Sequence, residues 1–188
     1  MNGGEIIVKS MEIQGVDRLF CVPGESFLPV LDALQTSSIE TVLARQEGGA
    51  AMMAEADGKL TGRPGIVLVT RGPGATNASA GIHIAQQDST PVIMLVGQVA
   101  RDMRGRDAFQ EVDFVQMFGG MAKHVEEIND VNRMAGAMAD AFRIAMEGRP
   151  GPVILSLPED MLYDEPDGDG ANELPPRVEV MRPHPKAD

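Results

Sequence analysis

The chain lacks several features that define large classes of proteins. Its 188 residues contain no tryptophan, one tyrosine and a single cysteine, Cys21. A lone cysteine excludes an internal disulfide framework, and inside an apolar run it is expected to be a buried small hydrophobe. Because no disulfides are needed, the expected compartment is the cytoplasm.

Long apolar runs and basic clusters are also missing. No segment approaches the roughly 20 apolar residues that a membrane span needs, and the start, MNGGEIIVKS, has no export signal pattern. The formal net charge is -12, and the 16 Lys and Arg residues form no run. Nucleic-acid binding draws on clustered basic residues. We therefore expect neither a membrane nor a nucleic acid as a partner.

Five short apolar runs lack the polar alternation of half-exposed strands, a pattern that suits parallel strands covered on both faces. They are Arg18 to Val22, Thr41 to Ala44, Gly65 to Thr70, Pro91 to Gly97 and Pro152 to Leu157. Segments with helical spacing lie between them. This alternation predicts an α/β fold with a doubly wound parallel sheet flanked by helices on both faces.

The composition changes near the C-terminal end. From Tyr163 onward the sequence is rich in proline, glycine and acids, and it has too few apolar residues to order itself without a neighbour. We therefore predict one domain over residues 1–162 and an acidic linker or tail over residues 163–188. A linker in that place suggests a further part of the protein beyond it.

Glu47 is the first candidate for chemistry. It follows the apolar run that ends at Ala44 and precedes an alanine-rich helix, where ligands collect at the carboxyl ends of parallel strands. The ordinary alternative is an acid in the first turn of a helix, which gains about 0.3 to 1 kcal/mol from the helix dipole. Small residues from Gly48 to Ala51 leave room for a flat ring or a partner helix.

The glycine-rich segment GPGATN, Gly72 to Asn77, opens another predicted helix. Backbone N–H groups at such a position favour anions, so a nucleotide-binding domain is one alternative. The segment has no GK[ST] ending of a P-loop, and Ala78 occupies the place of the last glycine of the dinucleotide pattern.

Several motifs occur together and in order along the chain. They are CVPGES (Cys21 to Ser26), RQEGGAA (Arg45 to Ala51), TRGPGATN (Thr70 to Asn77), the segment Gln86 to Glu111 and the segment Gly148 to Met161. This series, from about Glu5 to Leu162, resembles the N-terminal, pyrimidine-binding domain of acetolactate synthase-like thiamine diphosphate enzymes.

The resemblance implies site residues. Glu47 would stabilise the protonated aminopyrimidine, whose exocyclic nitrogen can then act as a base toward C2 of the thiazolium. Gln110 would be a second catalytic residue and, with Phe109, would line the substrate side, where an amide can donate to a developing oxyanion or carboxylate. The implied cofactor-binding residues are Pro23, Gly24, Glu47, Thr70, Pro73, Gly74 and Asn77.

The resemblance also implies a larger enzyme that decarboxylates a small 2-keto acid and joins the product to an acceptor, as in branched-chain amino acid biosynthesis. Thiamine diphosphate would be shared between subunits of a homodimer formed through this domain. Magnesium and the diphosphate would be held by a C-terminal domain absent from this chain, and the family allows FAD in a central domain. The 188-residue chain would then be inactive alone, with no metal ligands of its own. The alternative is a non-catalytic dimerisation or regulatory module of the same fold.

Some residues depart from the family pattern or imitate it. Gln46 replaces a common histidine, Glu25 a common glycine and Ala100 a common proline, so the identity of the acceptor substrate stays open.

The tripeptide GDG at 168–170 imitates the start of the family's metal motif, but it follows no apolar strand and is expected to be linker. We interpret a cluster of three arginines as a solvated loop paired with nearby acids. The cluster consists of Arg101, Arg104 and Arg106, with Asp102 and Asp107 as the expected partners.

Overall fold

A computed structural model describes residues 1–168 and 173–180. Its centre is a six-stranded, all-parallel sheet in the order β2-β1-β3-β4-β6-β5. The strands are β1 (Arg18–Cys21), β2 (Glu40–Leu43), β3 (Gly65–Val69), β4 (Val92–Gln98), β5 (His124–Glu127) and β6 (Pro152–Pro158). The predicted α/β fold with a parallel sheet is confirmed.

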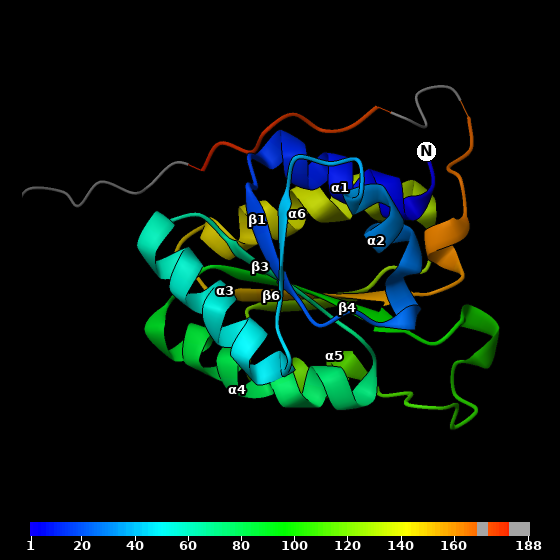
Figure 1. The fold of residues 1–188 in the computed structure, drawn as a ribbon, viewed down its shortest axis with the longest axis horizontal. Helices are drawn as coiled ribbons and strands as arrows, with labels where there is room; N and C mark the ends of the chain where they lie inside the picture. Colours follow the sequence, from blue (N-terminus) through cyan, green and yellow to red (C-terminus); the bar gives the residue numbers. More distant parts are fainter. Residues whose placement is uncertain (169–172, 181–188) are drawn as a thin grey trace, which may run out of the picture.

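The helices are of two kinds. The α-helices are α1 (Gly3–Gln14), α2 (Leu28–Leu34), α3 (Glu47–Thr61), α4 (Gly72–Asp88), α5 (Phe114–Phe118) and α6 (Met134–Met146). The short 3-10 helices are η1 (Glu25–Phe27), η2 (Arg101–Met103), η3 (Val131–Arg133) and η4 (Met161–Tyr163). Figure 1 shows α1, α2 and α6 on one face of the sheet and α3, α4 and α5 on the other.

Each face of the sheet has its own buried core, because successive strand side chains point to opposite faces. Leu19 and Cys21 of β1 belong to the core under α1, α2 and α6, whereas Phe20 belongs to the core under α3, α4 and α5. Burial raises the pKa of the Cys21 thiol to about 12. The expectation of a buried cysteine is confirmed.

The cap positions of the long helices carry the residues that such positions favour. Asn2 and Glu5 form a reciprocal capping box at the start of α1. Gly15 and Gly62 end α1 and α3 in the left-handed conformation, with φ of 81° and 67°. Asp130 caps the turn that leads into α6.

Two expectations about strands were wrong or incomplete. The run Thr41 to Ala44 is not covered on both faces: β2 is an edge strand, and Leu43 is 65% exposed. The sequence analysis also missed β5, whose four residues are half-buried and, apart from Val125, polar. This strand pairs with β6 in parallel, so its conformation depends on a neighbour and not on local pattern.

The strand order identifies the edge of the sheet where a ligand site is expected. From β1 the chain moves outward to β2, and it then returns to the other side of β1 to form β3. In open α/β sheets, a crevice forms at such a switch point, outside the carboxyl ends of the strands. The segments that follow β1 and β3 therefore face one another at this edge.

The described part of the C-terminal segment lies along the domain. Gln14 of α1 donates from Nε2 to the carbonyl oxygen of Pro176 at 3.3 Å and accepts from the N–H of Val178 at 2.9 Å. Leu174 and Val178 pack against the core under α1 and α6. The segment is thus ordered by its neighbours, while a domain boundary at residue 162 stays a prediction. Within the described residues, no helix is long and apolar enough to cross a membrane.

Helices α3 and α4 touch closely, and this contact makes a testable prediction. A Cβ atom on Gly81 would lie 2.6 Å from Cβ of Ala51 and 2.8 Å from its backbone carbon. We expect Gly81→Ala to lower the free energy of unfolding by about 1 to 3 kcal/mol through overpacking. Urea denaturation measures this change.

The matched control is Gly136→Ala on the exposed face of α6, where nothing lies within 4 Å of the added atom. This change should raise the free energy of unfolding by up to about 1 kcal/mol, because alanine favours helices. If Gly81→Ala were as stable as Gly136→Ala, the close contact would be disproved.

Candidate functional site

Gly24 and Thr70 meet at the switch point between β1 and β3. A Cβ atom on Gly24 would lie 2.6 Å from Cβ of Thr70, so only glycine fits there without a shift. Beside it, the hydroxyl groups of Ser26 and Thr70 share a hydrogen bond of 2.7 Å. The segments after two neighbouring strands are therefore locked together at the predicted ligand edge.

Glu47 reaches the same edge from α3. It is the first residue of that helix, directly after Gln46, whose side chain caps the helix by accepting from the N–H of Gly49 at 2.8 Å. The half-buried Glu47 carboxylate accepts from Nδ2 of Asn77 at 2.9 Å through Oε2. Among the described residues, no cation pairs with it. A Cβ on Gly74 would lie 3.4 Å from the other oxygen, Oε1, and 3.2 Å from Thr70 Cγ2.

The start of α4 also receives the Gln110 loop. The N–H of Gly72 donates to the carbonyl oxygen of Gln110 at 3.0 Å, and a Cβ on Gly72 would lie 2.8 Å from that oxygen. The N–H of Ala75 donates within the helix to Arg71. The bond from Ala75 is the ordinary first bond of the helix. Of the donors before it, the Gly72 N–H is occupied and Pro73 has no N–H, which argues against the nucleotide-binding alternative.

The site residues expected from sequence differ in how closely they gather. Gly24, Glu47, Thr70, Gly74 and Asn77 are joined by the contacts just described, and Gln110 joins them through its backbone. The side chain of Phe109 is 74% exposed. Pro73 is exposed in the first turn of α4, and Pro23 is exposed in the segment between β1 and Gly24.

A carboxylate organises the loop that carries Gln110. Glu111 accepts hydrogen bonds from the N–H groups of Gly105 at 2.6 Å and Ala108 at 3.1 Å, and from Nη1 of Arg104 at 2.6 Å. These bonds, led by those from the two backbone N–H groups, lower the pKa of Glu111. Nε of Arg104 donates to Oε1 of Glu127 at 3.1 Å.

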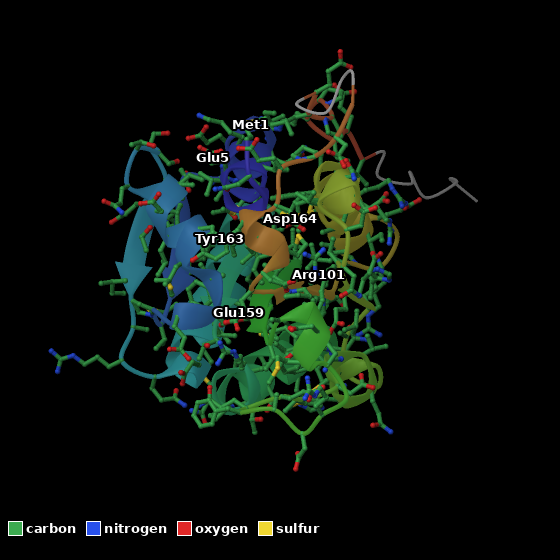
Figure 2. All side chains as sticks on the ribbon, turned by 90° about the vertical axis from the view of Figure 1, so that its right-hand side faces the viewer. Met1, Glu5, Arg101, Glu159, Tyr163 and Asp164 are labelled. Carbon is green, nitrogen blue, oxygen red and sulfur yellow. The ribbon has the colours of Figure 1, made fainter. Side chains whose placement is uncertain are left out.

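The arginine cluster is paired differently from expectation. Arg101 bonds to Asp160 at 2.7 Å and to Asp164 at 2.6 Å, and Arg104 bonds to Glu111 and Glu127; neither uses Asp102 or Asp107. Figure 2 shows Arg101 and Asp164 together beside η4. The acids that follow β6 lie close to Arg101 at the same edge of the sheet, although they are far from it in the sequence.

Arg71 was missed by the sequence analysis. Its side chain is only 7% exposed, and it donates from Nη1 to Glu25 at 3.0 Å and from Nη2 to Glu159. Its buried Nε has no hydrogen-bond partner among the described residues. Arg71 and Glu159 each stand directly after a strand segment, the same signal that selected Glu47. Both lie inside segments that carry the family resemblance, but they were overlooked because the resemblance assigned them no role.

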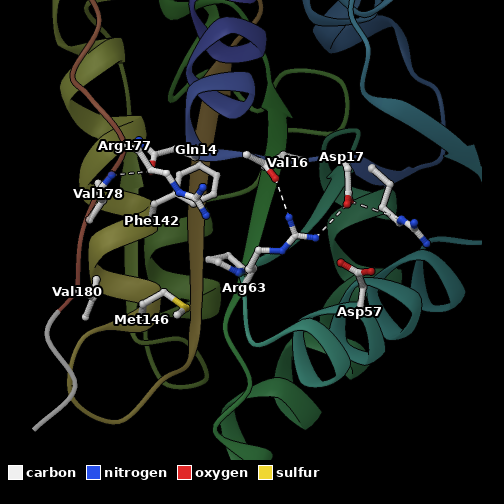
Figure 3. A pocket seen from close by; sticks show the side chains of 13 residues that line it. Gln14, Val16, Asp17, Asp57, Arg63, Phe142, Met146, Arg177, Val178 and Val180 are labelled. Atoms are coloured by element: carbon white, nitrogen blue, oxygen red, sulfur yellow. Dashed lines mark hydrogen bonds and ion pairs between the residues drawn. The ribbon is translucent and has the colours of Figure 1, made fainter.

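A cavity of about 200 Å³ lies away from this site, at the amino-terminal end of β1. Figure 3 shows Arg63 reaching toward Asp17 while Phe142 and Met146 of α6 line the other side. Arg63 bonds to the carbonyl oxygen of Gly15 at 2.8 Å and to Asp17 at 3.0 Å. Val178 of the C-terminal segment forms one wall, so the cavity lies between that segment and the rest of the domain.

Within residues 1–168 and 173–180, no group of three or more His, Cys, Asp or Glu side chains is arranged to hold a metal ion. The GDG tripeptide at 168–170 lies largely outside the described residues.

Comparisons with known proteins agree with this geometry. Residues 1–117 match the family described as thiamine pyrophosphate enzyme, N-terminal TPP binding domain. The chain is 41% identical, over 86% of its length, to the acetolactate synthase isozyme 2 large subunit of Escherichia coli (strain K12), covering 29% of that protein.

Further relatives give the same result. The isozyme 3 large subunit of the same organism is 43% identical over 93% of the chain, which covers 30% of that relative. The acetolactate synthase of Bacillus subtilis (strain 168) is 41% identical over 86% of the chain, which covers 28% of that relative. The chain thus spans less than a third of the length of these relatives.

The lowered pKa of Glu111 is directly testable. Its bonds favour the ionised form, so its carboxyl should titrate at lower pH in the folded chain than in the chain unfolded by urea. Glu111 then stabilises the fold at pH values above its unfolded pKa, and this stabilisation is lost as the pH falls through its folded pKa. Site-resolved carboxyl ¹³C NMR titration makes the comparison. A folded value equal to or above the unfolded one would contradict the bond pattern.

Proposed function

This chain belongs to the thiamine pyrophosphate enzymes as their N-terminal TPP-binding domain, and on that premise we propose that it forms part of an enzyme that decarboxylates and ligates 2-keto acids. The single observation that carries this proposal is the Glu47 carboxylate. It stands at the ligand edge with Asn77 as its hydrogen-bond donor and with glycine, not a side chain, facing its other oxygen.

The residues present fit the aminopyrimidine half of thiamine diphosphate. Gly24 and Gly74 let the backbone pass close to Thr70 and Glu47 without a side chain between them, which suits a site that holds a flat ring against the backbone. When bound, the cofactor supplies the carbanion chemistry that a protein side chain cannot. Glu47 would hold a proton at the pyrimidine ring nitrogen, and Asn77 would keep the carboxylate turned toward it.

Gln110 is proposed to act on the substrate side. Its backbone is fixed to the start of α4 by the Gly72 bond, while its side-chain amide has no hydrogen-bond partner among the described residues. An amide held in that way can donate to a carboxylate or a developing oxyanion of a 2-keto acid. Phe109, which is mostly exposed in this chain, would be covered when the site is completed.

A homodimer is proposed to complete the site. Apolar side chains on the outer faces of α3 and α4 support this proposal, since exposed apolar patches mark interaction surfaces. They are Met52, Met53 and Leu60 of α3 and Ile84 of α4. A C-terminal domain, outside this chain, would hold magnesium and the diphosphate, and FAD in a central domain is compatible with the proposal. We place the enzyme in the cytoplasm, with the 188-residue chain inactive alone.

The test of function is Glu47→Gln in the full-length protein. Loss of the proton-holding carboxylate should lower the rate of pyruvate turnover by about 100-fold or more. The matched control is Glu40→Gln, an exposed acid on neighbouring β2, which should leave turnover unchanged. Near-normal turnover by Glu47→Gln would rule out the proposed role.

The proposed dimer surface is tested by Met52→Asp. A charge in an apolar interface costs desolvation, so the variant should shift from dimer to monomer in analytical ultracentrifugation. The control is Val115→Asp on α5, because Met52 and Val115 are similarly exposed, at 45% and 49%. If both variants stayed dimeric, or both dissociated, this surface would not be the interface.

A further inference from the structure

One carboxylate closes the loop between β4 and α5. Glu111 takes hydrogen bonds from Arg104, Gly105 and Ala108, which lie three to seven residues before it in the sequence. Its side chain is only 10% exposed, so these donors replace water. Both of its oxygens are used: Oε1 by Arg104 and Gly105, and Oε2 by Ala108. The loop therefore folds around a single negative charge.

Arg104 fastens this loop to the sheet. Its Nε donates to Oε1 of Glu127 at the end of β5, and the other oxygen of Glu127 accepts from the buried Ser156 hydroxyl of β6 at 3.1 Å. Gln98, which is fully buried at the end of β4, donates from Nε2 to the carbonyl oxygen of Val112 at 2.8 Å. The loop is thus anchored to the ends of three neighbouring strands.

Gln110 lies inside this closed loop in a backbone conformation that its side chain does not favour. Its φ is 64°, in the left-handed region, and Asp107 in the same loop has a φ of 55°. Residues other than glycine keep such a conformation only when the surrounding bonds determine it. The bonds on either side are those of Glu111 and the bond from Gly72 to the Gln110 carbonyl oxygen.

We propose that Glu111 is a positioning residue of the 2-keto acid reaction: its carboxylate fixes the left-handed backbone of Gln110, and Arg104 and Glu127 fix Glu111. The amide of Gln110 is thereby held at the start of α4 beside the Glu47 site before substrate binds. This inference rests on the proposed function for its catalytic consequence, whereas the structural step concerns the loop alone.

The structural step is tested by hydrogen exchange of the full-length protein with Glu111→Gln. An amide offers one oxygen acceptor in place of two, and its NH₂ group would face donors that need an acceptor. Exchange in peptides covering residues 104–112 should become about tenfold faster, as expected for a locally opened segment. The control is Asp102→Asn in the same loop, an exposed acid whose side chain makes no hydrogen bond within the described residues. Unchanged exchange in Glu111→Gln would overturn the proposal.

The catalytic step is tested with a double-mutant cycle. Glu111→Gln should lower kcat by about 10- to 100-fold, as misplacement of a catalytic group does. It should change KM less, because the cofactor and its contacts remain. In a Gln110→Ala background the same change should have little further effect, because the group it positions is gone. Losses that simply multiply would show that Glu111 acts through general stability, and the positioning role would be rejected.

The two proposals fail in different ways. If Gln110→Ala kept full activity, the role of Gln110 in the proposed function would be wrong, and the exchange experiment would still decide whether Glu111 holds the loop. If Glu47→Gln abolished turnover while Glu111→Gln changed neither exchange nor kcat, the function would stand and the positioning role would fall.

Discussion

The close approach of the first turn of α4 to its neighbours is the constraint on which the site depends. At Gly72 a Cβ would lie 2.8 Å from the Gln110 carbonyl oxygen, and at Gly74 it would lie between Thr70 and Glu47. Segments that follow β2, β3 and β4 therefore meet at one helix start, through a backbone contact at Gly72 and through the side chains of Thr70 and Glu47 at Gly74. Larger residues at these positions would push the neighbouring segments apart and disturb the placement of Glu47 relative to the Gln110 loop.

Much of this arrangement could be predicted from the sequence, because the relevant signals are local. Uninterrupted apolar runs identified five of six strands, and glycines after helices marked the ends of α1 and α3. Glu47 was found because it follows a strand and begins a helix, and parallel strands place such residues at one edge. The order of motifs then predicted the family that the comparisons show.

The remainder could not be predicted because it depends on which distant segments become neighbours. The chain has 28 acidic residues, and nothing local assigns Asp160 and Asp164 to Arg101 in place of the adjacent Asp102. Strand β5 is mostly polar and acquires its conformation by pairing with β6. Strand β2 is exposed because it lies at the edge of the sheet. The sequence of a strand alone does not indicate whether it lies at an edge or in the centre.

Glu25 shows how such distant pairing changes the interpretation of a departure from the family pattern. Taken alone, a glutamate in place of a glycine suggests a free negative charge near the substrate. In the fold, Arg71 approaches from the next segment of the edge and donates to Glu25 at 3.0 Å while also bonding to Glu159. The Arg71 guanidinium is almost fully buried, whereas the Glu25 side chain is 68% exposed. Loss of the ion pair would therefore cost more at Arg71, whose charge would be left buried without a partner, than at Glu25, whose charge water can solvate. Glu25 is therefore a partner of the buried Arg71 guanidinium beside Gly72, and its charge is paired and not free.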